Sequence, residues 1–256
     1  MASKEQSVTL LRRNKRAQID ALNSLGFNLT EGARAADFPM FIKWGAGLLD
    51  VTVAANRKSD NMRFFFTVEE WQSLSATEQG LFLLRGVRVR ACGTSFVIAP
   101  DTITNKAWGE TNVSIPDLHS YQSQRDLYFY YNAYVETRLI VEGYQNSTSG
   151  SVVGAPAAEA ALAYKAFTLS RDGLEDTSEW CLPTPAHLMI MFRWINEINA
   201  VLSAVWSSDF GLILTGHWSC GRWSNSEVYR CNFDLGGSLY IEPSVNLKAV
   251  RPICLT

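Results

Sequence analysis

Residues 217–234, "HWSCGRWSNSEVYRCNFD", are the stretch on which the interpretation of the whole chain depends. The polar, glycine-containing segment "CGRWSNS" punctuates a C-terminal region, from Leu212 onward, that otherwise has the composition of strands. This pattern predicts strands joined by a turn. Trp218 is expected in the core, because Trp fills cores well. Arg222, Trp223, Tyr229 and Arg230 lie nearer the turn, and we expect them to be exposed.

The segment "CGRWSNSEV" is the predicted ligand-binding loop. Trp, Tyr and Arg offer large contact areas at low rotamer cost and are enriched in binding hot spots. The candidate ligand-binding residues are Arg222, Trp223, Asn225, Tyr229 and Arg230.

Motifs of enzyme chemistry are weak or absent in the sequence. There is no GxGxxG, no phosphate-binding loop and no GxSxG nucleophile elbow, and carboxylate pairs such as Glu69 with Glu70 fit solvated helix starts. His217 and Cys220 are the best candidates for a thiol enzyme, but in an extended chain their spacing places the two side chains on opposite sides. The five cysteines and three histidines lack the spacing of a metal site. We therefore predict a non-enzymatic protein without cofactor or metal.

Composition and charge narrow the class further. With 47% hydrophobic, 12% aromatic and 19% charged residues, the chain is expected to be globular. A net charge of -2 gives no global attraction to nucleic acid, and no run of about 20 apolar residues predicts membrane insertion. The opening "MASKEQSVTLLRRNKR" lacks the apolar run of a secretory signal, so we expect synthesis and folding in a cytoplasm.

The first half of the chain predicts a helix followed by strands. Residues 4–25 have helical spacing and end at Gly26. This helix is expected to dock on a partner protein through Leu11, Arg12, Arg13, Lys15, Arg16 and Ile19. Next come strands at "LLDVTV" and "MRFFF" around the turn "RKSDN", a capping box at Thr67 and Glu70, and a hairpin of "GVRVRA" and "SFVIAP" with Val87 and Val89 on its buried face.

The second half predicts helices before the final strands. Residues 126–144 fit either a strand or a helix, and residues 146–156 have the composition of a loop. Helices are predicted over residues 157–169 and 183–202. Helices inserted between hairpins indicate an α+β fold, with ligands bound on loops.

Two segments of the second half resemble the C-type-lectin-like family known as the fibrobacter major paralogous domain. "EWCLPTPAHLMIMF" is similar to the family's helix entry, and residues 217–255 are similar to its ending, "Y-W-S-S-T-E-Y-S", then "A-Y-Y-V-N-F" and a final "V-R-P-V-R". The matching residues are Trp180, Leu182, Pro183, Thr184, Leu188, Trp218, Ser219, Tyr229, Asn232, Phe233, Gly236, Val250, Arg251 and Pro252. The resemblance covers residues 85–256 and implies a C-type-lectin-like domain whose framework includes Trp218, Tyr229 and Phe233.

The sequence also departs from this family. His187 stands in place of an acidic residue, Cys181 in place of an arginine, and the last four residues differ. The sugar-binding tripeptides of calcium-dependent animal lectins are missing, so calcium-dependent sugar binding is not implied.

The opening segment and "FTVEEWQSL" resemble virion fibre proteins of phages that infect gut Bacteroidetes, including head fibres of crAss-like phages. The resemblance implies a virion protein assembled in the host cytoplasm, with capsid or other virion proteins and a host-surface glycan or protein as partners, and a homotrimeric state. We expect an N-terminal helical arm (1–36), a small β-rich docking region (37–84) and a C-type-lectin-like domain (85–256). The alternatives are a capsid decoration protein without a ligand, and a thiol enzyme similar to formylglycine-generating enzymes.

Overall fold

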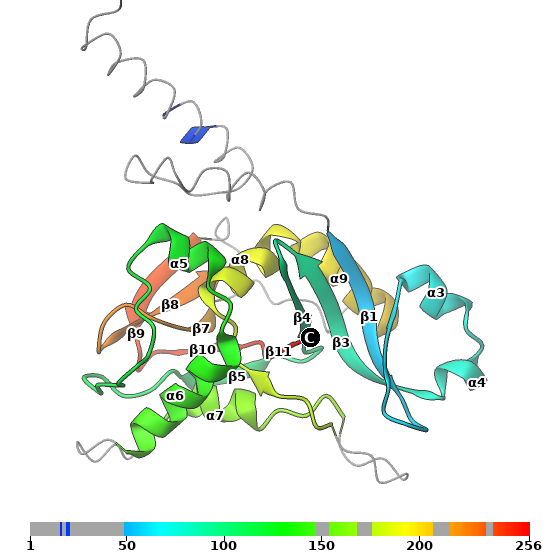
Figure 1. Cartoon of the computed structure of the whole chain (residues 1–256), viewed down its shortest axis with the longest axis horizontal. Helices are drawn as coiled ribbons and strands as arrows, with labels where there is room; N and C mark the ends of the chain where they lie inside the picture. The colour runs from blue at the N-terminus through cyan, green and yellow to red at the C-terminus, as the bar shows by residue number, and fades with distance from the viewer. Residues whose placement is uncertain are drawn as a thin grey trace, which may run out of the picture. The chain divides into compact units, whose positions relative to one another are not determined.

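The computed structural model describes residues 16, 19–20, 49–146, 154–167, 176–206, 216–233 and 238–256 (Figure 1). Its helices and two sheets confirm the predicted α+β class. Of the predicted docking residues, Arg16 and Ile19 are helical, and Leu11, Arg12, Arg13 and Lys15 lie outside the described residues. The elements from β1 onward belong to one compact unit, Leu49–Arg90 with Thr94–Thr256.

The first sheet has six strands in the order β2-β1-β3-β4-β11-β6. Their bounds are β1 Asp50–Arg57, β2 Arg63–Phe66, β3 Phe82–Ala91, β4 Thr94–Ile98, β6 Trp180–Cys181 and β11 Ile253–Leu255. Both predicted strand pairs are present, and Val87 and Val89 are fully buried while Arg90 is exposed. The division of the chain into 1–36, 37–84 and 85–256 stays a prediction, but residue 85 lies within β3, and strands on both sides of it share this sheet.

Two short helices follow β2. The predicted capping box begins α3, Val68–Ser73: Thr67 Oγ1 accepts from Glu70 N, and Glu70 Oε2 accepts from Thr67 N. A second capping box, which was not predicted, starts α4, Ala76–Gln79. Trp71 of α3 is buried against the rings of Phe66 and Phe82.

The second sheet has five strands in the order β5-β10-β7-β8-β9. Their bounds are β5 Ile103–Ala107, β7 Gly216–Arg222, β8 Glu227–Asn232, β9 Ser238–Pro243 and β10 Leu247–Val250. Trp218 of β7 is fully buried in the hydrophobic core, as expected, and its Nε1 donates to Lys106 O at 2.8 Å. Trp108 packs in the same core, with its ring centroid 6.2 Å from that of Tyr144.

The structure decides one open assignment in the second half and shortens one predicted helix. Residues 126–144, for which strand and helix were both open, form most of two helices, α5 Gln124–Phe129 and α6 Ala133–Gln145. Helix α7, Pro156–Leu162, ends earlier than predicted, and most of the predicted loop at 146–156 lies outside the described residues.

The single helix predicted over residues 183–202 is wrong. The segment forms α8, Pro185–Arg193, and α9, Ile195–Val205, which meet at 77°. Trp194 leaves the helical region at the break, with φ -113 and ψ 27. The bend lets α8 pack on β7 and β8 while α9 packs on β1, so the two helices serve different sheets. Among the described residues no single helix is long and apolar enough to cross a membrane; the bent pair α8 and α9 satisfies length and composition only.

Candidate ligand-binding site

The turn between β7 and β8 is shorter than the predicted loop. β7 ends at Arg222 and β8 begins at Glu227, so only residues 223–226 connect the strands. Trp223 N and Ser224 N both donate to Glu227 O, at 2.9 and 3.1 Å. Trp223 keeps 37% of its surface exposed, and Asn225 is exposed as well.

A second segment, residues 112–122, which precedes α5 in the chain, holds this turn through hydrogen bonds. Asn112 N donates to Asn225 O at 2.9 Å, and Ser226 Oγ donates to Asn112 Oδ1 at 2.9 Å. Gln122 Nε2 donates to Trp223 O at 2.9 Å. Because this distant segment fixes the turn at two points, the Trp223 side chain stands on a preorganised backbone.

Arg222 supports the site from within. Its guanidinium donates to Val113 O at 3.2 Å and to Ile115 O at 3.3 Å. Burial lowers the pKa of this guanidinium. Arg222, a predicted ligand residue, therefore anchors the second segment through its guanidinium.

Tyr229 and Arg230 lie on opposite faces of β8, as adjacent residues of a strand do. The prediction that Tyr229 is exposed is wrong, because it is 4% exposed. Its hydroxyl donates to Tyr121 O at 2.9 Å, and burial raises its pKa to about 12. The Tyr229 ring meets the Trp223 ring edge-on at 6.1 Å. Arg230 pairs with Glu242 and lies over the Tyr240 ring, 4.8 Å from its centroid. Of the five predicted residues, the structure brings together Trp223, Asn225 and the ring of Tyr229.

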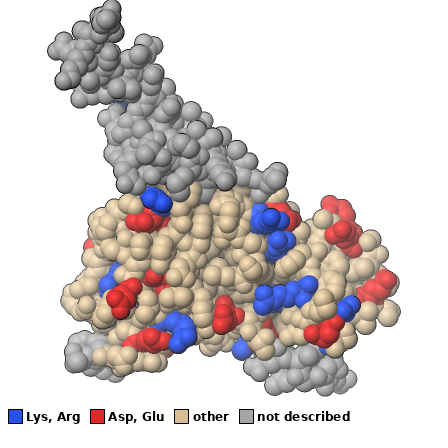
Figure 2. Space-filling view, in the orientation of Figure 1, with Lys and Arg blue, Asp and Glu red and all other residues tan. Residues whose placement is uncertain are grey.

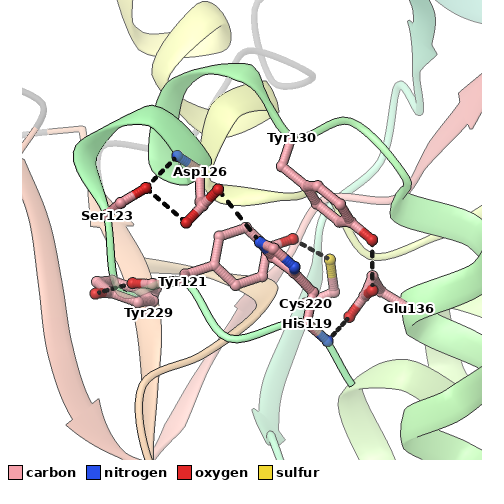
Figure 3. A network of polar contacts seen from close by, with 8 residues as sticks. All are labelled: His119, Tyr121, Ser123, Asp126, Tyr130, Glu136, Cys220 and Tyr229. Atoms are coloured by element: carbon pink, nitrogen blue, oxygen red, sulfur yellow. Dashed lines mark hydrogen bonds and ion pairs between the residues drawn. The ribbon is translucent and has the colours of Figure 1, made fainter. Parts of the chain in front are cut away.

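A polar network lies beside Tyr229, between the second segment, α6 and β7 (Figure 3). Glu136 is 2% exposed, and its carboxylate accepts from Tyr130 Oη at 2.9 Å and from His119 N at 3.1 Å. Burial raises the pKa of Glu136, although these hydrogen bonds oppose the shift. The His119 ring stacks on Tyr130 at 4.0 Å, and its Nε2 lies 3.6 Å from Asp126 Oδ1.

Cys220 belongs to this network as a buried thiol. Its Sγ lies 3.9 Å from the Tyr121 hydroxyl, and burial raises the pKa of the thiol well above its ordinary value. A nucleophilic cysteine needs a lowered pKa. His217 instead stacks on Phe233, 4.8 Å between ring centroids. Among the described residues, no group of three or more His, Cys, Asp or Glu could hold a metal ion.

Sequence reasoning missed the network. His119, Tyr130, Glu136 and Cys220 come from a loop, a helix end, a helix and a strand, and nothing in their spacing links them. Only the rich aromatic content around residues 128–131 marked the region, and it indicated no partner for these rings.

Glu136→Gln is expected to be neutral, or to stabilise the fold by up to about 1 kcal/mol, at pH 7, because the amide avoids the desolvation of a buried charge. The folded pKa of Glu136 is raised from the ordinary 4.5, so the folded state holds this proton more tightly and stability falls as pH rises through that range. Urea unfolding at about pH 4 and about pH 7 should show that the free energy of unfolding of Glu136→Gln, relative to that of the wild type, is higher at pH 7 than at pH 4. Glu142→Gln, on the exposed side of the same helix, is the control. If Glu136→Gln destabilised the protein more at pH 7 than at pH 4, the predicted direction of the pH dependence would be wrong.

No family model matches the chain, and no curated protein matches it. Among solved structures, the chain is similar to a fimbrial protein from Bacteroides ovatus, with 13% sequence identity and a TM-score of 0.42. The similarity covers 63% of this chain and 35% of the fimbrial protein, so the chain spans about a third of that protein's length. At this TM-score the likeness carries no argument about the function of this chain.

Proposed function

We propose that the chain is a non-enzymatic phage virion protein, a head fibre or tail-associated fibre, that displays a C-type-lectin-like domain for binding a host-surface glycan or protein. The observation that carries the binding proposal is the exposed Trp223 ring on a turn fixed by hydrogen bonds from a second segment. A preorganised aromatic side chain gains contact area without an ordering cost on binding.

Ile241 extends the apolar surface beside Trp223. It is the register partner of Tyr229 across β8 and β9, so both side chains lie on the same face of the sheet. Ile241 is 43% exposed and Trp223 is 37% exposed, while the Tyr229 ring between them is buried. The two exposed side chains form the Trp223–Ile241 surface, and the exposed Asn225 lies on the same turn as Trp223. Such a mixture of apolar contact and a few polar groups suits the apolar face of a sugar ring or a partner side chain.

The virion setting is supported by the resemblance of the opening residues to phage fibre proteins. In this proposal the N-terminal arm docks on capsid or other virion proteins through Leu11, Arg12, Arg13, Lys15, Arg16 and Ile19. The protein assembles in the host cytoplasm as a homotrimer, an arrangement with closed symmetry that buries apolar faces left by the single subunit.

Trp223→Ala is expected to reduce binding of the purified protein to host cells at least about tenfold, the effect of truncating one aromatic hot-spot residue. The measurement is flow cytometry of the labelled full chain on susceptible bacteria. Val135→Ala removes a 46%-exposed apolar side chain from α6 and is the matched control. Trp223→Phe should retain part of the binding, because an aromatic face remains.

Wild-type protein that binds no host cell, while its loss destabilises particles, would favour the capsid decoration protein. Undiminished binding by Trp223→Ala, with unchanged folding, would exclude the Trp223–Ile241 surface as the binding face.

A further inference from the structure

One face of the six-stranded sheet carries a cluster of arginines far from Trp223 in the chain. Register places Asp50 opposite Arg90 between β1 and β3, and it places Arg63 and Phe65 of β2 on the same side. Thr52, opposite Arg88, belongs to this side as well. We call this side the arginine face; its charged residues are Arg63, Arg88, Arg90 and Asp50.

Positive charge on the arginine face exceeds negative charge. Among the described residues of β1, β2 and β3 that point this way and are not buried, three are arginines and one is an acid, Asp50. The buried Arg85 of β3 is hydrogen-bonded to Ser178 and Cys254. Arg88 Nη1 lies 3.2 Å from Asp50 Oδ2, so the carboxylate of Asp50 is already paired with Arg88. Arg63 and Arg90 are exposed and have no ion pair with the described residues. Since the whole chain carries a net charge of -2, this surplus is local, and Figure 2 shows Lys and Arg side chains over this sheet.

Arg88 is held in one orientation on this face. Its Nε donates to Ser95 Oγ at 3.2 Å, and its guanidinium lies over the Phe65 ring, 4.2 Å from the centroid. Phe65 stays 37% exposed beside it. The pair makes a flat, partly apolar centre between Arg63 and Arg90.

The opposite side of these strands is closed. Val53, Val87 and Val89 point there and are fully buried, and α9 packs on β1 from behind (Figure 1). The strands therefore form a rigid support, and the arginines cannot turn inward to find partners.

We propose that the arginine face binds an extended acidic segment of a partner protein. Arg88 and Arg90 are two residues apart on one strand, about 7 Å, which is the spacing of carboxylates on alternate residues of an extended chain. Arg63 lies two strands across and four residues along the sheet from Arg88, about 17 Å away, a distance that about five residues of an extended chain cover. A guanidinium binds a carboxylate through two parallel hydrogen bonds. Single-stranded nucleic acid is the poorer fit, because its binding sites stack successive bases on several rings and this face exposes the single ring of Phe65. The proposal does not depend on the binding of host cells.

The test uses the full chain and a fluorescein-labelled peptide of about ten glutamates, followed by fluorescence anisotropy. The double variant Arg63→Gln/Arg90→Gln should weaken binding at least about tenfold, because it removes the two exposed arginines that form no ion pair within the described part of the chain. Binding by the wild type should also weaken as salt rises from about 50 mM to about 200 mM. The control is Arg125→Gln/Arg138→Gln, which removes the same charge from exposed positions on α5 and α6. Trp223→Ala should leave peptide binding unchanged.

Three outcomes would overturn the proposal. The first is a wild-type protein that does not bind the peptide at the lower salt. The second is equal weakening by the two double variants, which reports net charge alone. The third is an oligothymidine that binds more tightly than the peptide and is lost in Arg63→Gln/Arg90→Gln, which would assign the face to nucleic acid.

Discussion

Gly86→Ala is expected to destabilise the protein by about 3–5 kcal/mol, the sum of a steric overlap and a strained backbone. Gly86 has φ +154, and a Cβ at this position would lie 2.0 Å from the carbonyl oxygen of Ile98. That oxygen belongs to β4 beside it, so relief requires β3 and β4 to separate. The residue stands where the register of β1 and β3 shifts between Ala54 and Ala55, which is where a bulge favours glycine.

Gly93→Ala is the matched control. Gly93 also has a positive φ, +82, but a Cβ there would meet nothing within 4 Å, so only the backbone cost of about 1–2 kcal/mol applies. Guanidinium unfolding of both variants measures the difference. Equal losses would show that the overlap with Ile98 is relieved without cost.

Asp176→Asn is expected to cost about 3–5 kcal/mol at pH 7, because it removes a buried charge from a network built around it. Asp176 is 1% exposed, and its Oδ2 accepts from Trp180 Nε1 at 2.6 Å and from Ala166 N at 2.9 Å. Its Oδ1 accepts from Ser178 N at 2.9 Å and from the Ser178 hydroxyl. Arg85, which is 1% exposed, donates to the same hydroxyl, so the variant leaves a buried guanidinium without the nearby carboxylate.

The loss should depend on pH in a direction opposite to that of Glu136. Burial tends to raise the pKa of Asp176, but the hydrogen bonds from Ser178, Trp180 and Ala166 outweigh it and hold the pKa below the ordinary 3.8. The wild type therefore has the full contribution of this carboxylate above its ordinary pKa and loses it as pH falls through the lowered value. Urea unfolding from about pH 7 to about pH 3 should show the gap between wild type and variant narrowing. Asp117→Asn, at an exposed position, should show no such trend, and a constant gap for Asp176→Asn would contradict the shift.

Local patterns predicted β1, β2, β3 and β4 of the first sheet but not β6. The alternation of Val87 and Val89 with Arg88 and Arg90 identified a half-buried strand, and Thr67 with Glu70 identified a helix start. Each of these signals depends on residues within one strand or one helical turn. The helix break at Trp194 carries no such signal, because its cause is the presence of two sheets that α8 and α9 cover separately.

The positions of the candidate residues were predicted in part, whereas their role in binding stays a prediction. Trp223 and Asn225 lie on the exposed turn where the composition placed them. Arg222 and Arg230 were both predicted to bind the ligand. In the structure Arg222 anchors Val113 and Ile115, and Arg230 pairs with Glu242 on the other face of the sheet. Their partners are far away in the chain, so residue type and spacing could not identify them.

The sequence by itself determined the α+β class, the hairpins, the capped helix and the candidate turn, because strand alternation and helix capping arise between residues a few positions apart. Only the tertiary structure decided which polar groups meet: Glu136 with His119 and Tyr130, Asp176 with Trp180, and Arg88 with Phe65. The physical reason is that burial and strand register set these contacts. Both follow from the close packing of segments brought together by the whole fold.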